Sequence, residues 1–247
     1  MKIILLRHGE SKWNLENRFT GWEDVGLTSK GKKEAKFAAN QLLKGSYKIS
    51  SVHTSLLKRA IETTSIVAKN ICFQDNDVRY EWRLNERHYG ALQGLNKSET
   101  AAKYGENQVQ IWRRSFDTPP PLLKKNDKRH PRFNKKFSKI ENKNLPLGES
   151  LKMVIERLNP FWNKYFNNII LNDNSHLIVA HSNSLRAIVK ILENLSNEEI
   201  MNVNIPTGVP LVYTFNNDKE VAEKKYLIDN KELEKKQDLV KRQGTIQ

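Results

Sequence analysis

Two histidines stand directly after short apolar runs of the sequence. His8 follows residues 2–6 and lies between Arg7 and Gly9, and His181 follows residues 176–180. A neutral imidazole can attack phosphorus through one ring nitrogen if the other nitrogen carries the hydrogen and an acceptor holds it. Arginine suits bidentate phosphate binding, and glycine lets the backbone approach closely. The residues around His8 therefore predict phosphoryl transfer.

Three arginines strengthen this interpretation. Taken alone, a histidine is more often structural and an arginine more often solvated. Arg59, however, follows a second strand candidate at residues 51–55, and Arg113 and Arg114 form an adjacent pair. Together with two strand-end histidines they predict an anion site, in which His181 would donate to a phosphoryl oxygen in the transition state.

Strands and helices alternate along the predicted structure. Period-two and short apolar patterns predict the strands, at residues 2–6, 51–55, 78–84, 176–180, 211–215 and 225–228. Helical spacing predicts the helices, at residues 28–44, 56–69, 97–104, 106–114, from 149 onward with a kink or break at Pro160, at 184–194, and after a capping box at Ser196 and Glu199.

This alternation predicts an α/β fold, a three-layer α/β/α sandwich with a mostly parallel sheet. We expect one domain over residues 1–247, with a proline-rich capping insertion at about 85–147 and a mobile tail at about 231–247. Ligands of such sheets bind beyond the carboxyl ends of the strands. The polar groups after three strands should therefore meet at one edge.

The charge of the chain favours anionic partners. Its 247 residues hold 42 Lys and Arg against 28 Asp and Glu, a net charge of +14 with pI near 9.7. Nine basic and two acidic side chains fall within residues 122–144, a local net charge of +7. A solvated lysine-rich loop is the simpler interpretation of that segment, and a nucleic-acid or polyanion binder is the alternative from another class. Known nucleic-acid motifs are absent from the sequence.

Several other classes are excluded by composition. The single cysteine, Cys72, cannot form an internal disulfide, and we expect it to be half-buried in a reducing compartment. No Cys/His array has zinc-site spacing, and no apolar run approaches the roughly 20 residues of a membrane span. The apolar run of residues 3–6 is too short for a signal peptide. A cytoplasmic protein is expected.

Longer motifs identify a family. The sequence resembles the cofactor-dependent phosphoglycerate mutases of the histidine phosphatase superfamily, from residue 1 to about 226. The motifs are LLRHGES at 5–11, NRFTGW at 17–22, LKRA at 57–60, LNERHYGALQGLNK at 84–97, WRR at 112–114 and NIPTGVPLVY at 204–213. The RHG motif alone indicates only the superfamily, whereas the block at 84–97 favours the mutase branch.

The resemblance implies a reaction and a set of residues. Phosphoglycerate mutases interconvert 3-phosphoglycerate and 2-phosphoglycerate in glycolysis and gluconeogenesis through a phosphohistidine, primed by 2,3-bisphosphoglycerate and without a metal. His8 would be the nucleophile, Glu86 the general acid and base, and His181 a stabiliser of the transition state. The transferring phosphate would be held by Arg7, Asn14, Arg59 and Asn183. The rest of the substrate would be held by Thr20, Gly21, Tyr89, Lys97, Arg113 and Arg114.

Glu86 and Ser182 need separate consideration. A glutamate in a loop is usually solvated, whereas an acid and base such as Glu86 would need partial burial. Ser182 stands where the family usually has glycine. If that position has a positive φ, serine would cost about 1 kcal/mol. If the family needs only space there, the Ser182 hydroxyl would crowd the phosphate or donate to it.

The resemblance leaves alternatives within the enzyme class. A bisphosphoglycerate mutase or a broad phosphatase could use the same scaffold, and water access to phosphorylated His8 would separate the three. The arginine pair and the long insertion favour the mutase. The resemblance further implies a homo-oligomer, either a dimer or a tetramer. We expect phosphoglycerates as the partners, and neither a membrane nor nucleic acid.

Overall fold

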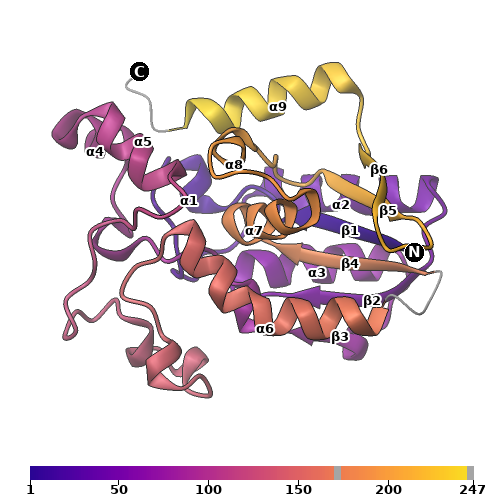
Figure 1. Ribbon diagram of the computed structural model, residues 1–247, viewed down its shortest axis with the longest axis horizontal. Coiled ribbons are helices and arrows are strands. Elements are labelled where there is room, and N and C mark those ends of the chain that lie inside the picture. The colour runs from indigo at the N-terminus through magenta and orange to yellow at the C-terminus, as the bar shows by residue number, and fades with distance from the viewer. Residues whose placement is uncertain (170–173, 244–247) are drawn as a thin grey trace.

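The computed structural model describes residues 1–169 and 174–243 (Figure 1). Its strands form one six-stranded sheet in the order β3-β2-β4-β1-β5-β6, in which β1 to β4 run parallel. β5 runs antiparallel to both of its neighbours, β1 and β6. The strands are β1 (Lys2–Arg7), β2 (Ile49–Thr54), β3 (Val78–Tyr80), β4 (Ser175–Ala180), β5 (Pro210–Phe215) and β6 (Val221–Tyr226). The expected mostly parallel sheet is confirmed.

Side chains of β1 alternate between two hydrophobic cores. Ile3 and Leu5 pack with α6 (Leu151–Ile169) and α7 (Ser182–Glu193) on one face. Ile4 and Leu6 pack with α2 (Ser29–Lys44) and α3 (Lys58–Asn70) on the other face. Because successive strand residues point to opposite faces, helices cover both sides of the sheet, as the expected three-layer sandwich requires.

Local sequence signals explain the helix starts. Thr28 caps α2 by accepting the N–H of Gly31, and the buried face of this helix includes Ala35, Ala38 and Leu42. The capping box at Ser196 and Glu199 forms in both directions ahead of α8 (Glu199–Asn202). The expected helix at 184–194 begins earlier, at Ser182, and ends before Asn194, which has a left-handed φ of 48°.

The insertion at 85–147 covers the carboxyl ends of the parallel strands, where Figure 1 draws it as the magenta and salmon part of the chain. It contains the expected helices, α4 (Lys97–Tyr104) and α5 (Glu106–Arg114), and then mostly irregular chain. Phe137, Ile140 and Leu145 from this irregular chain pack against Trp22 and Leu57 of the main domain. The insertion is therefore tied to the domain by an apolar cluster of its own.

Three local expectations were wrong. The third strand ends at Tyr80, because the backbone then turns into a 3-10 helix at Trp82–Leu84, and the last strand lies at Val221–Tyr226 instead of 225–228. Cys72 is exposed, not half-buried, since it lies in the turn after α3 with a φ of 57°. At Pro160 we expected a kink or a break, and because α6 continues through this residue, only the kink stays a prediction.

The segment expected to be a mobile tail contains α9 (Asn230–Arg242), which lies along α8 in Figure 1. Asp229 caps this helix by accepting the N–H groups of Lys231 and Glu232. Gln237 of α9 donates to the carbonyl of Asn204, and Val240 is buried. The mobility of the tail stays a prediction, and residues 244–247 lie outside the described chain.

Candidate active site

The ring of His8 is fixed in one tautomer at the end of β1. Its Nδ1 lies 2.7 Å from the carbonyl oxygen of Gly9, which can only accept, so Nδ1 carries the hydrogen. Nε2 accepts a hydrogen bond from Arg59 Nε at 3.2 Å. Gly9 is required here, because a Cβ would lie 2.1 Å from the carbonyl oxygen of Gly31. The lone pair of Nε2 is thus available as a nucleophile.

Burial and neighbouring charges keep His8 neutral. Burial lowers its pKa well below the usual value of 6.5, and the cations Arg59 and Arg7 lower it further. Arg59 is itself locked in place, since its two terminal nitrogens donate to the carbonyls of Glu23 and Gly21, each at 2.9 Å. Nε2 of the nucleophile therefore stays unprotonated at neutral pH.

His181 stands behind His8, with 5.0 Å between the two ring centroids. Its Nε2 lies 2.6 Å from the hydroxyl of Ser55, and that hydroxyl accepts the N–H of Leu57. The buried Nδ1 has no hydrogen-bond partner among the described residues. This ring nitrogen is therefore left for a contact with a ligand.

Glu86 is buried, at 7% exposure, and its carboxyl group lines the same pocket. Oε1 accepts two backbone N–H groups, from Arg87 at 2.8 Å and from Asn183 at 3.1 Å. A proton on this carboxyl would therefore sit on Oε2, since Oε1 is already occupied as an acceptor. The partial burial that an acid and base needs is present.

The pocket itself is strongly cationic. Glu86 is the only carboxylate among the described residues that line it, against seven basic side chains. The lining consists of Arg7, His8, Asn14, Arg18, Thr20, Arg59, Glu86, Tyr89, Lys97, Arg113, Arg114, Ser182, Asn183, Arg186, Val240 and Gln243.

Burial and mutual repulsion of the basic side chains indicate that the pocket suits an anionic ligand. Burial, and after it the charges of Arg113, Arg7 and Arg114, hold the pKa of Lys97 well below its usual range. Burial and the charges of Arg186 and Arg113 lower the pKa of Arg114 to about 8. A ligand with several negative charges would relieve this repulsion and raise both pKa values.

Two asparagine amides present their NH2 groups to the pocket. Asn14 Oδ1 accepts from the N–H and hydroxyl of Ser11, at 3.0 and 2.9 Å. Asn183 Oδ1 accepts from Arg186 Nη1 at 2.9 Å, and its Nδ2 donates to the Tyr89 hydroxyl at 3.3 Å. With their oxygens occupied, both side chains offer donors to an anion.

Ser182 lines the pocket as the first residue of α7, and its φ is not positive. Backbone strain at this position is thereby excluded. Where the family usually has glycine, Ser182 can therefore affect the ligand only through its hydroxyl, which would crowd the phosphate or donate to it.

Of the sequence-predicted residues, all but Gly21 and His181 line the pocket directly. Gly21 holds Arg59 through its carbonyl, and His181 packs against His8. The sequence interpretation missed Arg18, Arg186, Val240 and Gln243. Arg186 could have been found from its spacing, because it lies one helical turn after Asn183, whereas the two C-terminal residues belong to the expected mobile tail.

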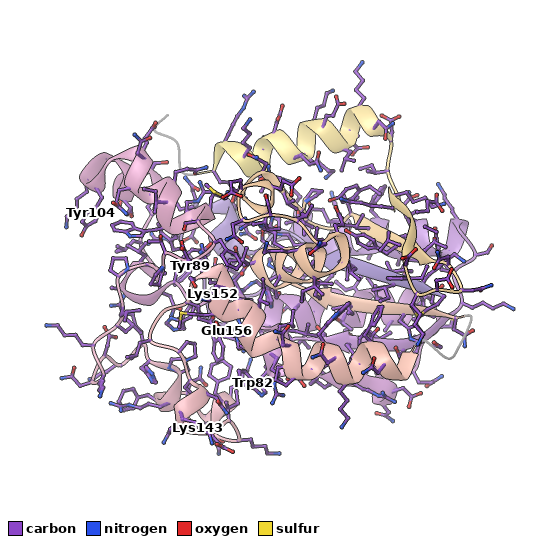
Figure 2. All side chains as sticks on the ribbon, in the orientation of Figure 1. Trp82, Tyr89, Tyr104, Lys143, Lys152 and Glu156 are labelled. Carbon is purple, nitrogen blue, oxygen red and sulfur yellow. The ribbon has the colours of Figure 1, made fainter. Side chains whose placement is uncertain are left out.

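The nine basic residues of segment 122–144 are all exposed, and none of them lines the pocket. In Figure 2, Lys143 lies at the far end of the insertion, well away from Tyr89. The net charge of +7 on residues 122–144, which is half of the net charge of the chain, therefore lies outside the pocket.

Comparisons with known proteins agree with the fold and identify the family. The profile of the histidine phosphatase superfamily, branch 1, matches residues 3–226. A 2,3-bisphosphoglycerate-dependent phosphoglycerate mutase of Treponema denticola is 51% identical over 99% of both chains. One of the same name from Dichelobacter nodosus is 48% identical over 98% of this chain and 99% of its own.

Solved structures share the fold at low identity. A mycobacterial glucosyl-3-phosphoglycerate phosphatase has a TM-score of 0.67 at 21% identity, covering 91% of this chain and 96% of its own. An alpha-ribazole phosphatase of Shigella flexneri has a TM-score of 0.64 at 19% identity, covering 90% and 95%. Within residues 1–169 and 174–243, no helix is long and apolar enough to cross a membrane, and no three His, Cys, Asp or Glu side chains cluster as metal ligands would.

Proposed function

Because the chain belongs to the histidine phosphatase superfamily, and its similarity to phosphoglycerate mutases extends over nearly its whole length, we propose that it is a phosphoglycerate mutase. It interconverts 3-phosphoglycerate and 2-phosphoglycerate through a phosphohistidine. The single observation that carries this function is the His8 tautomer, with Nδ1–H on the Gly9 carbonyl and Nε2 available to attack.

In the first half-reaction His8 Nε2 forms a bond to phosphorus while the phosphorus–oxygen bond of the donor breaks. The leaving oxygen takes a proton from Glu86, which becomes a carboxylate. In the second half-reaction Glu86 removes the proton of an acceptor hydroxyl, and that oxygen displaces His8 from phosphorus. Arg7, Arg59, Asn14, Asn183 and His181 hold the transferring phosphoryl group.

The rest of the ligand needs the remaining cations. A phosphoglycerate carries a carboxylate and a phosphate, which bears about −1.5 to −2 charge. Lys97, Arg113 and Arg114 are the cations assigned to these groups, with Thr20 and Tyr89 as neutral donors. The repulsion between these three cations supports this assignment.

The priming group is 2,3-bisphosphoglycerate, which supplies the phosphoryl group that His8 carries before the first turnover. The pocket fits such a ligand, because seven basic side chains face one carboxylate. Arginines and histidines provide all the positive charge in this scheme, so we propose that no metal is needed. Location in the cytoplasm remains a prediction from the composition, and assembly as a homodimer or homotetramer remains a prediction from the resemblance.

A phosphatase would use the same nucleophile but admit water to it. Val240 and Gln243 line the pocket from the C-terminal helix side, and Lys97 Nζ donates to Gln243 Oε1 at 3.2 Å. This contact closes the pocket between the insertion and the C-terminal segment. It favours transfer over hydrolysis.

The test is an assay of 3- to 2-phosphoglycerate conversion with and without catalytic 2,3-bisphosphoglycerate, in the presence of a chelator. We expect conversion that depends on the bisphosphoglycerate and is unaffected by the chelator. Release of inorganic phosphate faster than transfer would identify a phosphatase instead. Loss of conversion on chelation alone would refute the metal-free scheme.

A further inference from the structure

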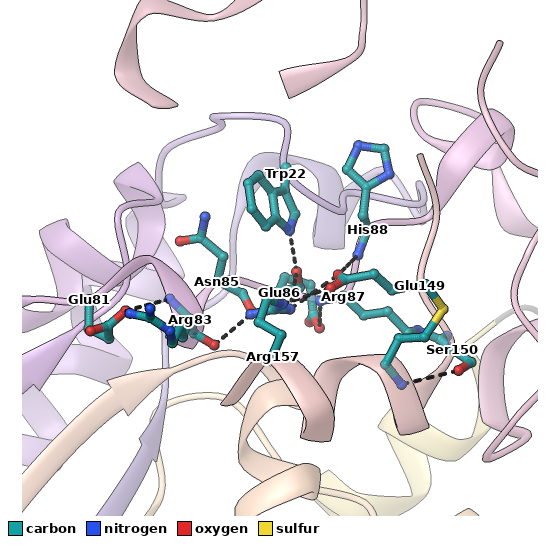
Figure 3. Close-up of polar contacts among 11 residues, drawn as sticks. Trp22, Glu81, Arg83, Asn85, Glu86, Arg87, His88, Glu149, Ser150 and Arg157 are labelled. Atoms are coloured by element: carbon teal, nitrogen blue, oxygen red, sulfur yellow. Dashed lines mark hydrogen bonds and ion pairs between the residues drawn. The ribbon is translucent and has the colours of Figure 1, made fainter. Parts of the chain in front are cut away.

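A buried ion pair lies outside the pocket, beneath the loop that carries Glu86. Arg157 of α6 and Glu149 form a bidentate pair, with Nε–Oε1 at 2.7 Å and Nη2–Oε2 at 3.1 Å. The two side chains are only 6% and 3% exposed. Neither of them lines the pocket. Figure 3 shows the pair between α6 and the loop.

The ion pair binds the loop backbone on both sides of Glu86. Arg157 donates to the carbonyls of Arg83 and Asn85, and at 3.4 Å to the carbonyl of Glu86 itself. Glu149 Oε2 accepts the N–H of His88 at 2.8 Å. Residues 85–88 belong to no helix or strand, so these hydrogen bonds take the place of a regular ladder.

Trp22 is the third side chain that holds this loop, and we call Arg157, Glu149 and Trp22 together the brace. Trp22 Nε1 donates to the Glu86 carbonyl at 2.6 Å, and the Arg157 guanidinium lies 5.7 Å from the centre of the Trp22 ring. The backbone of the general acid and base is therefore fixed from two directions. Its carboxyl group is in turn oriented by the N–H groups of Arg87 and Asn183.

We propose that Arg157, oriented by Glu149, is a positioning residue that places the Glu86 carboxyl for proton transfer. This inference rests on the proposed function, since it assigns Glu86 as the proton donor. Loss of a proton donor slows phosphoryl transfer more when the leaving group is more basic, because a basic leaving group needs the proton to depart. The alkoxide that leaves from a phosphoglycerate needs a proton, whereas the 4-nitrophenolate that leaves from 4-nitrophenyl phosphate does not.

The experiment compares the rates at which the two donors phosphorylate His8, by rapid quench of the full-length protein. In Arg157→Met we expect phosphorylation by 2,3-bisphosphoglycerate to fall about 100-fold, as for a misplaced general acid, and phosphorylation by 4-nitrophenyl phosphate to fall less than about fivefold. In a Glu86→Gln background, Arg157→Met should add no further loss with bisphosphoglycerate, because the proton donor is already absent.

Controls separate positioning from folding. Lys152 and Glu156 are exposed residues of the same helix (Figure 2), and Lys152→Met and Glu156→Gln should leave both rates unchanged. Arg157→Lys keeps the charge but loses the bidentate geometry, and Trp22→Phe keeps the ring but loses the donor. If Arg157→Met does not fold, these two milder variants should still slow the phosphorylation of His8 by bisphosphoglycerate more than its phosphorylation by 4-nitrophenyl phosphate.

The outcomes are distinct. Wild-type protein that is not phosphorylated by bisphosphoglycerate would overturn the proposed function itself. Wild-type protein that is phosphorylated, with brace variants that slow both donors equally, would show that Arg157 is merely structural and overturn this inference.

Discussion

Arg59 Nε donates a hydrogen bond to His8 Nε2 at 3.2 Å, so the attacking nitrogen is held by a cation before any phosphate binds. A donor can point at Nε2 only when that nitrogen carries a lone pair. The same guanidinium lowers the pKa of His8 through its charge. Burial is the larger cause of the lowered pKa, and the Arg59 contact adds to it while it holds the direction of Nε2.

Replacing Arg59 should therefore raise the pKa of His8. In Arg59→Met the burial of the ring remains but one cation is lost, so the pKa moves up toward 6.5 and the nucleophile is lost to protonation at a higher pH. Arg59→Lys keeps the charge and should shift the pKa less. Ring-nitrogen NMR of the free protein across pH measures this directly. An unchanged pKa in Arg59→Met would contradict the electrostatic assignment.

Replacing Ser182 with glycine should change activity only modestly. Because Ser182 has no positive φ, Ser182→Gly relieves no backbone strain. We expect kcat/KM to stay within about tenfold, or 1.4 kcal/mol of transition-state free energy. A rise of several orders of magnitude in steady-state turnover would mean that the serine hydroxyl compromises the natural site.

Removing the C-terminal helix should increase hydrolysis of phosphorylated His8 relative to transfer of its phosphoryl group to phosphoglycerate. Termination after Asp229 deletes Val240 and Gln243 from the pocket lining and frees Lys97. Water then reaches phosphorylated His8, so the ratio of phosphate release to phosphoglycerate conversion should rise. Lys235→Met, on the exposed face of the same helix, should leave the ratio unaltered. An equal ratio in the truncated and intact proteins would show that this segment does not exclude water.

Acid should destabilise the fold through buried neutral histidines. Burial lowers the pKa of His88 to about 3, and its Nδ1 accepts the N–H of Gly90 at 3.0 Å. As the pH falls below 6.5, the unfolded chain takes up a proton that folded His88 refuses. The free energy of unfolding then falls by up to about 1.4 kcal/mol per pH unit for this group.

His88→Asn keeps an acceptor at this position and removes the titration. Urea unfolding between pH 7 and pH 4 should therefore give a shallower loss of stability in the variant than in the wild type. The same dependence in both proteins would show that His88 does not contribute.

The site was predictable from the sequence wherever the chemistry lies next to a regular element. His8 and His181 follow strands whose apolar runs are visible in the sequence, Arg59 follows the more polar β2, and parallel strands bring their ends together. Glu86 was assigned only through resemblance. Its burial depends on Arg157 and Trp22, which are distant in sequence, and no local pattern encodes such contacts.

The C-terminal helix was missed for a related reason. Its composition is polar, and Val240 is its only buried residue among those described. The helix is as amphipathic as α2, but nearly all of its side chains are polar or charged, and this composition favoured the interpretation as a mobile tail. Its place over the pocket follows from Gln237 and Gln243, whose partners are far away in the sequence.

The central claim is that His8 carries the phosphoryl group between two phosphoglycerates. Labelled 2,3-bisphosphoglycerate should leave acid-labile label on the wild-type protein and none on His8→Ala, and unlabelled 3-phosphoglycerate should remove that label as bisphosphoglycerate. Label that persists in His8→Ala, or that leaves the wild type only as inorganic phosphate, would contradict the claim.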